Sequence, residues 1–416
     1  MNRIIIIGNG FDLAHGLPTS YKNFINWYID KRVNNLSTCH SNVNSDELCK
    51  FRISEHTWHS YIFSNYGPLW NEILRESLFK TIKGHPEYFQ YTQSRFLKAI
   101  TKCIEKNNWV DIEKEYYDLL SKDFESSDNE NITKLNKELE CLKNNLIAYL
   151  KEVETKLINE SIVKDNIKEK ILEPINPRDI SVNAKKNIWP NFIKRRFDNN
   201  REYLYDLFKN YSNDIKNSIS KIINFEKEYE YQIMDMGINS VNDDNLPKEL
   251  LYPDSILLLN FNYTKTADLY LPKEDIFKVN HIHGKLSNPK SIIFGYGDEL
   301  DENYKKLLKD NNNEYLKNIK SINYLNYTNY REMLSYIESA PYQIYIMGHS
   351  CGLSDKTLLN TLFEHDNCVS IKPFYYINEE GLDNYTDIVQ NISRNFTDMK
   401  LMRDRVVNKT FCETLE

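Results

Sequence analysis

The sequence predicts an α/β protein with an open, mostly parallel, Rossmann-like sheet and a large helical insertion. Three observations support this fold class. The chain begins with the short apolar run RIIII at 3–7, which ends at Gly8 and is typical of a strand buried on both faces. Similar apolar runs return after residue 254. The roughly 200 residues between them have the periodicity of helices rather than of strands.

The first strand is followed by a polar loop and then by a predicted helix at 19–33. Thr19 or Ser20 is a suitable N-cap, because its side-chain oxygen can accept a hydrogen bond from the first helical turn. The apolar residues of this helix recur on one face, at spacings of three and four: Tyr21, Phe24, Ile25, Tyr28 and Ile29. A strand, a glycine-bearing loop and a helix form the opening unit of an open α/β sheet.

The segment 40–245 is predicted to be an all-helical insertion. In its clearest piece the apolar residues alternate steps of three and four, as in a heptad seam: Ile132, Leu135, Leu139, Leu142, Leu146, Tyr149 and Val153. We favour an intramolecular helical hairpin for this seam. The alternative is a coiled coil between two copies of the chain, so a homo-oligomer stays open as an expectation.

Strand patterns return in the last third of the chain, as short apolar runs that end in polar or glycine-containing turns at 255–262, 277–284, 291–298, 342–350 and 368–376. Helices are predicted between the last two strands, at 354–365, and near the end, at 383–396. The two ends of the chain are therefore predicted to form one α/β domain, residues 1–39 and 246–416, around a helical insertion domain, residues 40–245.

Composition and charge exclude several classes of protein. Apolar residues make up 41% of the chain and aromatic residues 13%, which is enough for a sizeable core and excludes wholesale disorder. The formal net charge is −7, from 53 basic and 60 acidic residues, so a nucleic-acid partner is not expected. No apolar run is long enough to span a membrane, and the seven cysteines are scattered without a C-x-x-C pair. We expect a cytoplasmic protein with reduced thiols and no membrane partner.

Polar and glycine residues follow five of the predicted strands, and ligands of open α/β sheets bind outside the carboxyl ends of the strands. These ends read GNGFDLAHGLPTS, NFNYT, HIHGK, FGYGD and GHSCGLSD. Gly8 and Gly10 can form a tight turn that brings backbone N–H groups close to phosphate. The loop is not a G-x-G-x-x-G dehydrogenase fingerprint, because Leu13 occupies the third position. Asp12 is expected either to accept a ribose hydroxyl or to cap the local turn.

In each of two pairs of residues near the strand ends, only one member is expected to face the pocket. Of His281 and His283, the second directly precedes Gly284 at a strand end and is our candidate for a general base with a pKa near the working pH. Of Asn260 and Asn262, the second lies nearer the turn and can orient water or a ribose hydroxyl. No further ligands lie at zinc-site spacing, so no metal is expected.

Two further motifs leave alternatives open. Asp111 and Glu113 begin the helix WVDIEKEYYDLL, where they either face solvent or close the pocket as accessory acids from the insertion. GHSCG matches the G-x-S-x-G nucleophile elbow as a string, with Ser350 at its centre. The predicted helix begins only at Ser354, which disfavours that interpretation.

Taken in order, IIIIGNGFDLAHGLPTSYKNF, WVDIEKEYYDLL, NFNYT, HIHGK, FGYGD and GHSCGLSDKTLL resemble the AbiH family of bacteriophage abortive-infection proteins. The resemblance covers both ends of the chain and one piece of the insertion. It implies a role in antiphage defence in a bacterial cytoplasm.

A more distant resemblance, to the sirtuin-like NAD-binding fold, implies chemistry. It assigns Asn262 and His283 to the cleavage of the bond between nicotinamide and ribose, and Gly348 with Ser350 to a late nucleotide-binding turn. With the loop motifs, the residues predicted to bind the nucleotide are Gly8, Asn9, Gly10, Asp12, Gly16, Pro18, Thr19, Gly284, Gly348, Ser350 and Asp355.

The resemblances together imply a suicidal NAD glycohydrolase, with NAD as substrate or ligand rather than as cofactor. The insertion is expected to be a lid, an assembly surface or the binding site of a phage trigger protein. Two alternatives stay open: a non-catalytic nucleotide-binding sensor, and a metal-dependent nuclease that uses Asp12 and Glu113.

Overall fold

The computed structural model describes residues 1–38, 43–53, 89–107, 110–126, 129–199, 248–272, 274 and 276–416. Its centre is a five-stranded sheet in which every neighbouring pair is parallel. The strand order across the sheet is β6 (Phe277–His281), β5 (Ile256–Asn260), β1 (Asn2–Ile7), β7 (Tyr342–Met347) and β8 (Cys368–Phe374). The predicted open parallel α/β fold is confirmed.

The chain changes direction across the sheet at β1. Ile5 lies beside Leu258 of β5 on one side and beside Tyr345 of β7 on the other. The chain runs outward from β1 through β5 to β6, and then crosses to build β7 and β8 on the opposite side. Such a switch point leaves a crevice outside the carboxyl ends of the strands, which is where open α/β sheets bind their ligands.

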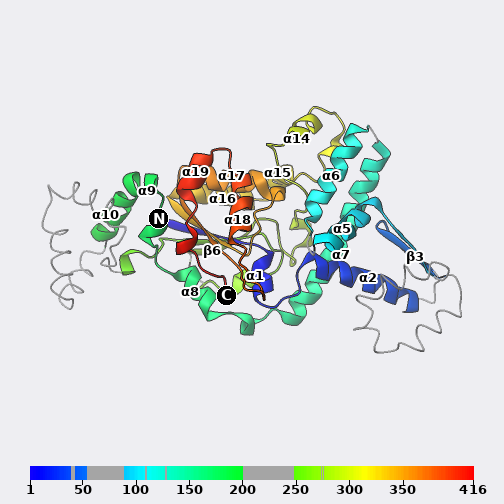
Figure 1. The fold of residues 1–416 in the computed structure, drawn as a ribbon, viewed down its shortest axis with the longest axis horizontal. Coiled ribbons are helices and arrows are strands. Elements are labelled where there is room, and N and C mark those ends of the chain that lie inside the picture. Colours follow the sequence, from blue (N-terminus) through cyan, green and yellow to red (C-terminus); the bar gives the residue numbers. More distant parts are fainter. Residues whose placement is uncertain are drawn as a thin grey trace.

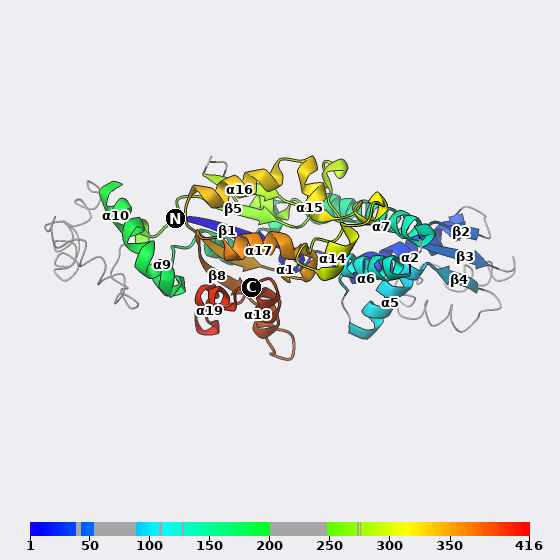
Figure 2. The ribbon, with the colours of Figure 1, turned by 90° about the horizontal axis from the view of Figure 1, so that it is seen from above.

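Helices cover both faces of the sheet (Figures 1 and 2). On one face, alternate strand residues such as Ile4 and Ile6 pack against α16 (Asn329–Ser339), α17 (Lys356–Glu364) and α18 (Tyr385–Arg394). On the other face, Ile5 and Ile7 pack against α1 (Asn9–Ala14) and α8 (Asp165–Leu172). Because β1 is buried on both faces, its four consecutive isoleucines need no alternation with polar residues.

A second core, called the helical core below, lies beside the carboxyl ends of the strands. It is built from α2 (Tyr21–Thr38), α5 (Arg95–Asn107), α6 (Ile112–Glu125) and α7 (Asn129–Leu157). The seven apolar residues of the heptad seam are all buried in this core, against other helices of the same chain. The contacts therefore agree with the intramolecular interpretation of the seam.

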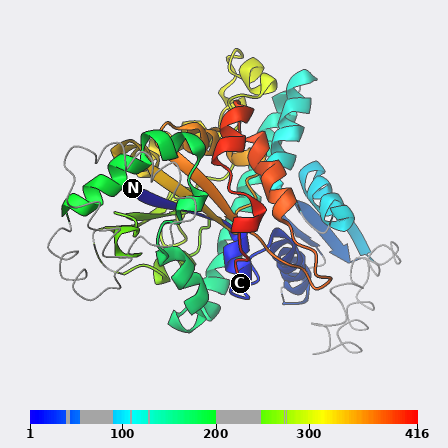
Figure 3. The same ribbon diagram turned by 60° about the vertical axis from the view of Figure 1, so that its left-hand side comes forward.

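The opposite end of the molecule carries α9 (Val182–Asn187) and α10 (Trp189–Asn199). Trp189 and Phe192 pack against Met1 at the amino end of β1, and Figure 3 shows these green helices beside the N-terminus. Residues of 165–193 thus pack on the sheet, although they lie within the predicted insertion. The division into domains at residues 39 and 245 stays a prediction.

Two details of the sequence interpretation are wrong. Residues 291–298 form a 3₁₀ turn and a loop instead of a strand, because the only ladder contact in this stretch is an isolated bridge between Tyr296 and Ile319. The segment 40–245 is not entirely helical. It contains an antiparallel sheet of β2 (Val43–Ser45), β3 (Cys49–Ile53) and β4 (Phe89–Gln93), in which the buried Phe51 stacks on Tyr91.

The remaining described elements are short helices that connect the larger ones. The α-helices are α14 (Glu302–Leu307), α15 (Lys320–Asn323) and α19 (Met399–Arg405). The 3₁₀ helices are η1 (Glu160–Ile162), η2 (Pro177–Asp179), η4 (Lys248–Leu250), η5 (Thr266–Leu269), η6 (Pro289–Ser291), η7 (Asn313–Tyr315), η8 (Tyr324–Asn326), η9 (Leu353–Asp355) and η10 (Lys409–Phe411). Within the described ranges, no helix has the length and apolar composition needed to span a bilayer.

Candidate functional site

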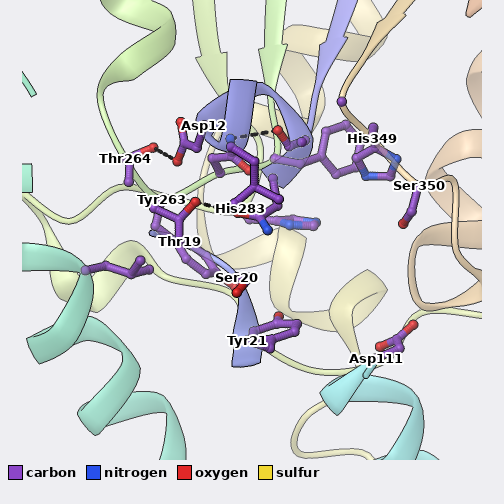
Figure 4. Close-up of a pocket in the computed structure, with 18 of the residues that line it drawn as sticks. Asp12, Thr19, Ser20, Tyr21, Asp111, Tyr263, Thr264, His283, His349 and Ser350 are labelled. Atoms are coloured by element: carbon purple, nitrogen blue, oxygen red, sulfur yellow. Dashed lines mark hydrogen bonds between the residues drawn. The ribbon is translucent and has the colours of Figure 1, made fainter. Parts of the chain in front are cut away.

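A cavity of about 290 Å³ opens at the switch point of the sheet (Figure 4). Its floor comes from the residues that follow β1, β5, β6 and β7, and its other walls come from the helical core. Most of the residues that the sequence singled out line it: Gly8, Asn9, Gly10, Asp12, Thr19, Asp111, Glu113, Asn262, His283, Gly348, Ser350 and Asp355. The parallel sheet thus brings four of the five predicted strand ends to one edge, whereas FGYGD at 294–298 neither follows a strand nor lines the cavity.

Glycines in the cavity floor allow the loops after β1 and β7 to lie in close contact. A Cβ on Gly8 would lie 2.5 Å from Cα of His349, and one on Gly348 would lie 2.0 Å from the backbone nitrogen of Phe11. Gly348 also has a φ of +74°, which L side chains rarely adopt. The Gly10 N–H donates to the carbonyl of Gly348 at 2.8 Å, so this donor is already used and is not directed at a phosphate.

Asp12 forms a buried carboxylate wall of the cavity. One oxygen, Oδ2, accepts a hydrogen bond from the Thr264 hydroxyl at 2.7 Å, as Figure 4 shows, whereas the buried Oδ1 has no partner at hydrogen-bonding distance. Burial raises the pKa of Asp12 to about 6, although the hydrogen bond from the Thr264 hydroxyl to the charged form partly opposes this shift. At neutral pH the cavity therefore contains a charged carboxylate with no lysine or arginine paired to it among the described residues.

Asn260 and Asn262 have different surroundings. Residues two positions apart within a strand would share a face, but β5 ends at Asn260 and Asn262 follows the strand. Asn260 is fully buried and holds the β5 loop by donating to the Thr264 carbonyl at 3.1 Å and accepting from the Asn262 backbone N–H at 3.0 Å. Asn262 lines the cavity, where its side-chain amide donates to the Gly8 carbonyl at 3.0 Å. Asn262 therefore joins the β1 and β5 ends of the floor.

His281 and His283 also lie in different surroundings, because β6 ends at His281 and His283 follows the strand. His281 lies off the cavity, between Asn260 and Asp268, with Nε2 3.1 Å from Oδ2 of Asp268. His283 is buried in the cavity floor, with Nε2 3.0 Å from the Tyr324 hydroxyl and 3.3 Å from Oδ1 of Asp355. If Nε2 carries the proton toward these acceptors, Nδ1 keeps the lone pair that a general base needs.

Lys320 is the centre of a buried charged cluster beneath the cavity, although no motif of the sequence indicates it. Its ammonium contacts Oε2 of Glu113 at 2.8 Å and Oδ1 of Asp355 at 2.7 Å. Glu113 comes from α6 in the helical core, and its other oxygen accepts from the Gly295 N–H at 3.0 Å. One lysine thus joins the helical core to Asp355, which lies beside both His283 and His349.

The charges in this cluster are divided unequally. Burial disfavours ionisation of Asp355, but Lys320 and then His283 more than offset it and hold the pKa of Asp355 well below its usual range. Burial raises the pKa of Glu113 to about 8, because Lys320 opposes the shift only in part. Burial and the charge of Lys320 lower the pKa of His283 to about 4. His283 is therefore uncharged at neutral pH, and the expectation that it titrates near the working pH is wrong.

The G-x-S-x-G string does not form a nucleophile elbow. In such an elbow the central serine sits on the strained turn. Here the non-glycine residue with positive φ is Cys351, at +54°, whose backbone N–H donates to Nδ1 of His349 at 3.0 Å. The opposite nitrogen of His349 faces Asp355 at 3.5 Å, and no hydrogen bond joins Ser350 Oγ to a histidine in the described part of the chain.

Three residues predicted to bind the nucleotide lie outside the cavity lining. Gly16 has a φ of +72° and ends the turn after α1, and the Pro18 carbonyl accepts from the Tyr149 hydroxyl. Gly284 has a φ of +84°, and a Cβ there would lie 2.1 Å from the Ser291 carbonyl oxygen. Their geometry serves turns and loop contacts. Nearby, Asn9 does line the cavity and accepts from the Thr19 hydroxyl at 2.7 Å.

Local sequence patterns do not reveal the lysine of the cluster or the aromatic walls of the cavity. Phe261 lines the cavity, with its ring 5.0 Å from that of His283 and 4.3 Å from that of His349, and Tyr21 and Tyr263 line it too. Tyr21 was assigned only to the apolar face of its helix. Phe261 could have been found from its position directly after a predicted strand. Lys320 could not, because its charged and polar sequence neighbours are typical of an exposed segment.

The raised pKa of Asp12 leads to a prediction about stability. Since the folded pKa of about 6 lies above the ordinary value of 3.8, the folded state holds this proton more tightly than the unfolded state does. The free energy of unfolding should therefore fall as pH rises from about 4 to 6, by an amount on the order of 3 kcal/mol. Asp12→Asn should lack this part of the decline, as measured by urea denaturation across that pH range.

The matched control is Asp366→Asn, an exposed carboxylate just before β8 and hence at the amino ends of the strands, away from the cavity. It should retain the decline of the wild-type protein. Identical pH dependence in the wild-type protein and Asp12→Asn would contradict the assigned pKa.

Comparison with known proteins places this site in a family. No curated protein and no solved structure matches the chain. The family model described as "Bacteriophage abortive infection AbiH" matches residues 4–376, a range that contains every residue lining the cavity. The chain therefore belongs to the AbiH family of bacteriophage abortive-infection proteins, as the ordered motifs of its sequence predict.

Proposed function

We propose that this abortive-infection protein is an NAD glycohydrolase, which protects a bacterial population by consuming NAD in the infected cell. The observation that supports this best is the convergence of Asp12, Asn262 and His283 on one cavity at the switch point of the sheet. The distant resemblance to sirtuin-like NAD-binding proteins supports the same substrate.

The charges of the cavity suit this reaction. When the bond between the ribose C1′ and the nicotinamide nitrogen breaks, the electron pair leaves with neutral nicotinamide and positive charge develops on the ribose. Carboxylates close to that charge stabilise the transition state more than they stabilise the ground state. Water then adds to C1′ and gives a proton to a base, so the products are nicotinamide, ADP-ribose and one proton.

His283 is the proposed base. It is uncharged at neutral pH, and its Nε2 is oriented by Asp355 and Tyr324. The arrangement resembles the acid–histidine pairs of other hydrolases, in which the carboxylate fixes the tautomer and the ring orientation. Asn262 is proposed to position the ribose or the water from the β5 end of the floor.

The test is the release of nicotinamide from NAD by the purified protein, followed by chromatography. His283→Ala should slow the release by about 100-fold or more, the usual contribution of a general base. His365→Ala is the matched control. His365 follows the end of α17, contacts Glu338 of α16, and lies close to the amino end of β8, away from the cavity. It should keep wild-type activity.

The same variants are also compared for their ability to protect cells against phage. The assay with purified protein is repeated with added phage lysate, which supplies a possible trigger. Protection lost in His283→Ala and kept in His365→Ala is the expected result. Full protection by His283→Ala, or no release of nicotinamide even with the lysate, would refute the proposed activity and favour a non-catalytic sensor.

A further inference from the structure

The walls of the cavity are unusually acidic for a site that binds a nucleotide. Four acidic side chains line it, those of Asp12, Asp111, Glu113 and Asp355, of which Glu113 is largely protonated at neutral pH. Among the described lining residues, Lys22 is the one lysine or arginine. Lys320 lies beneath the cavity and forms ion pairs with Glu113 and Asp355, and its charge also favours the ionised form of Asp111. The other two carboxylates form no ion pair with a lysine or arginine among the residues that the structure describes.

These two carboxylates come from different parts of the fold. Asp12 belongs to α1 on the cavity floor, and its buried Oδ1 has no hydrogen-bond partner. Asp111 is the N-cap of α6, where it accepts from the Lys114 backbone N–H at 3.0 Å, and it lies on the other side of the cavity in Figure 4. A ligand between them would lie between two carboxyl groups that have no ion-pair partner in the described part of the chain.

The neutral surfaces of the cavity are aromatic. Phe261, Tyr21 and Tyr263 supply flat apolar faces beside the two carboxylates. A flat cation is attracted to carboxylates by its charge and to aromatic faces by their quadrupole. A phosphate group would be bound poorly here. The Gly10 N–H already donates to Gly348, and lysine and arginine are scarce among the described lining residues.

We propose that the cavity selects the positively charged, oxidised pyridinium ring of NAD, and that it discriminates by charge against the neutral forms of the same ring. The proposal deepens the function above and rests on it for the identity of the ligand. The pyrophosphate would then lie toward the exposed Lys22 at the start of α2, away from Asp12. The neutral nicotinamide that cleavage produces would lose this attraction, so it would leave readily and inhibit weakly.

The test measures binding of two ring fragments that have nearly the same shape but differ in charge. 1-Methylnicotinamide is a cation, and nicotinamide is neutral. Each is titrated into the full-length protein at fixed ionic strength and about pH 7.5, above the pKa of Asp12, and followed by ligand-observed NMR. The cation should bind about tenfold more tightly or better, and NAD should likewise bind more tightly than its reduced form.

Asp12→Asn should reduce the preference for the cation, whereas Asp366→Asn, at the opposite edge of the sheet, should keep it. If Asp12→Asn does not fold, lowering the pH of the wild-type protein below about 6 removes the same charge and should weaken binding of the cation alone. Equal binding of the two fragments by the wild-type protein would overturn the proposal.

The outcome is separable from that of the hydrolase test. Preference for the cation without nicotinamide release would support charge selection and leave the protein as a binding module. Nicotinamide release without preference for the cation would support the hydrolase and overturn charge selection.

Discussion

Lys320→Met should lower the free energy of unfolding by about 3–5 kcal/mol, the usual cost of removing one partner from a buried ion pair. The side chain of Lys320 is 1% exposed and lies between two buried carboxylates. Without its ammonium, the buried carboxylate of Asp355 loses its main counter-charge, and Glu113 loses a hydrogen-bond donor. The measurement is urea denaturation at neutral pH, with the melting temperature as a second readout.

Lys317→Met is the matched control, because Lys317 lies three residues away and is 57% exposed beside Glu314 at 3.7 Å. It should change stability by less than about 0.5 kcal/mol. The double variant Lys320→Met with Asp355→Asn should recover part of the loss, since the uncompensated charge of Asp355 is also removed. Equal stability of Lys320→Met and Lys317→Met would show that the buried cluster does not form.

The same variant should change the titration of His283. Lys320 and burial both lower the pKa of this histidine, and Asp355 opposes them. Removal of Lys320 leaves Asp355 as an uncompensated neighbour, so the pKa of His283 should rise toward neutrality. NMR titration of the imidazole protons would measure this shift, which a purely mechanical role of Lys320 would not produce.

Gly348→Ala should be at least as damaging as Lys320→Met and should abolish the cavity. The added Cβ would lie 2.0 Å from the Phe11 nitrogen, and this contact is with backbone, which cannot rotate away. The loops after β1 and β7 would have to separate, and the hydrogen bond from Gly10 to the Gly348 carbonyl would be lost. We expect a loss of more than about 3 kcal/mol in stability, together with loss of the proposed nucleotide binding.

Gly381→Ala separates the effect of crowding from that of backbone conformation. Gly381 has a φ of +79°, close to the +74° of Gly348, but no atom lies within 4 Å of an added Cβ. Its substitution should cost only the strain of a left-handed alanine, about 1–2 kcal/mol. If the two variants lost the same stability, the close approach of the β1 and β7 loops would be refuted.

Much of the fold followed from local patterns. The isoleucine run, the later strands at 256–260, 277–281, 342–347 and 368–374, and the helices at 21–38 and 385–394 were all predicted at nearly these positions. Periodicity suffices for such elements, because a strand or helix buries one face whatever partner covers it. The edge of the sheet that holds the cavity was predicted for the same reason, since parallel strands must end together.

The stretch 291–298 shows where local pattern misleads. Its residues Ile292, Ile293 and Phe294 are apolar and buried, as in a strand, yet they pack as a loop over the cavity end of the sheet. Burial alone produced the strand-like pattern. Whether a buried apolar run also has a hydrogen-bonding neighbour depends on the positions of other strands, which local sequence does not encode.

By itself, the sequence determined the alternation of buried runs and polar strand ends, and hence the parallel sheet, its functional edge and the family. The tertiary structure alone decided which side chains meet at that edge. The ammonium of Lys320 finds Glu113, 207 positions away, and Asp355, 35 positions away. Burial and the charge of Lys320 lower the pKa of His283 to about 4. Periodicity reports which face of an element is buried, whereas ion pairs and pKa values depend on distances between elements, which exist only once the chain has folded.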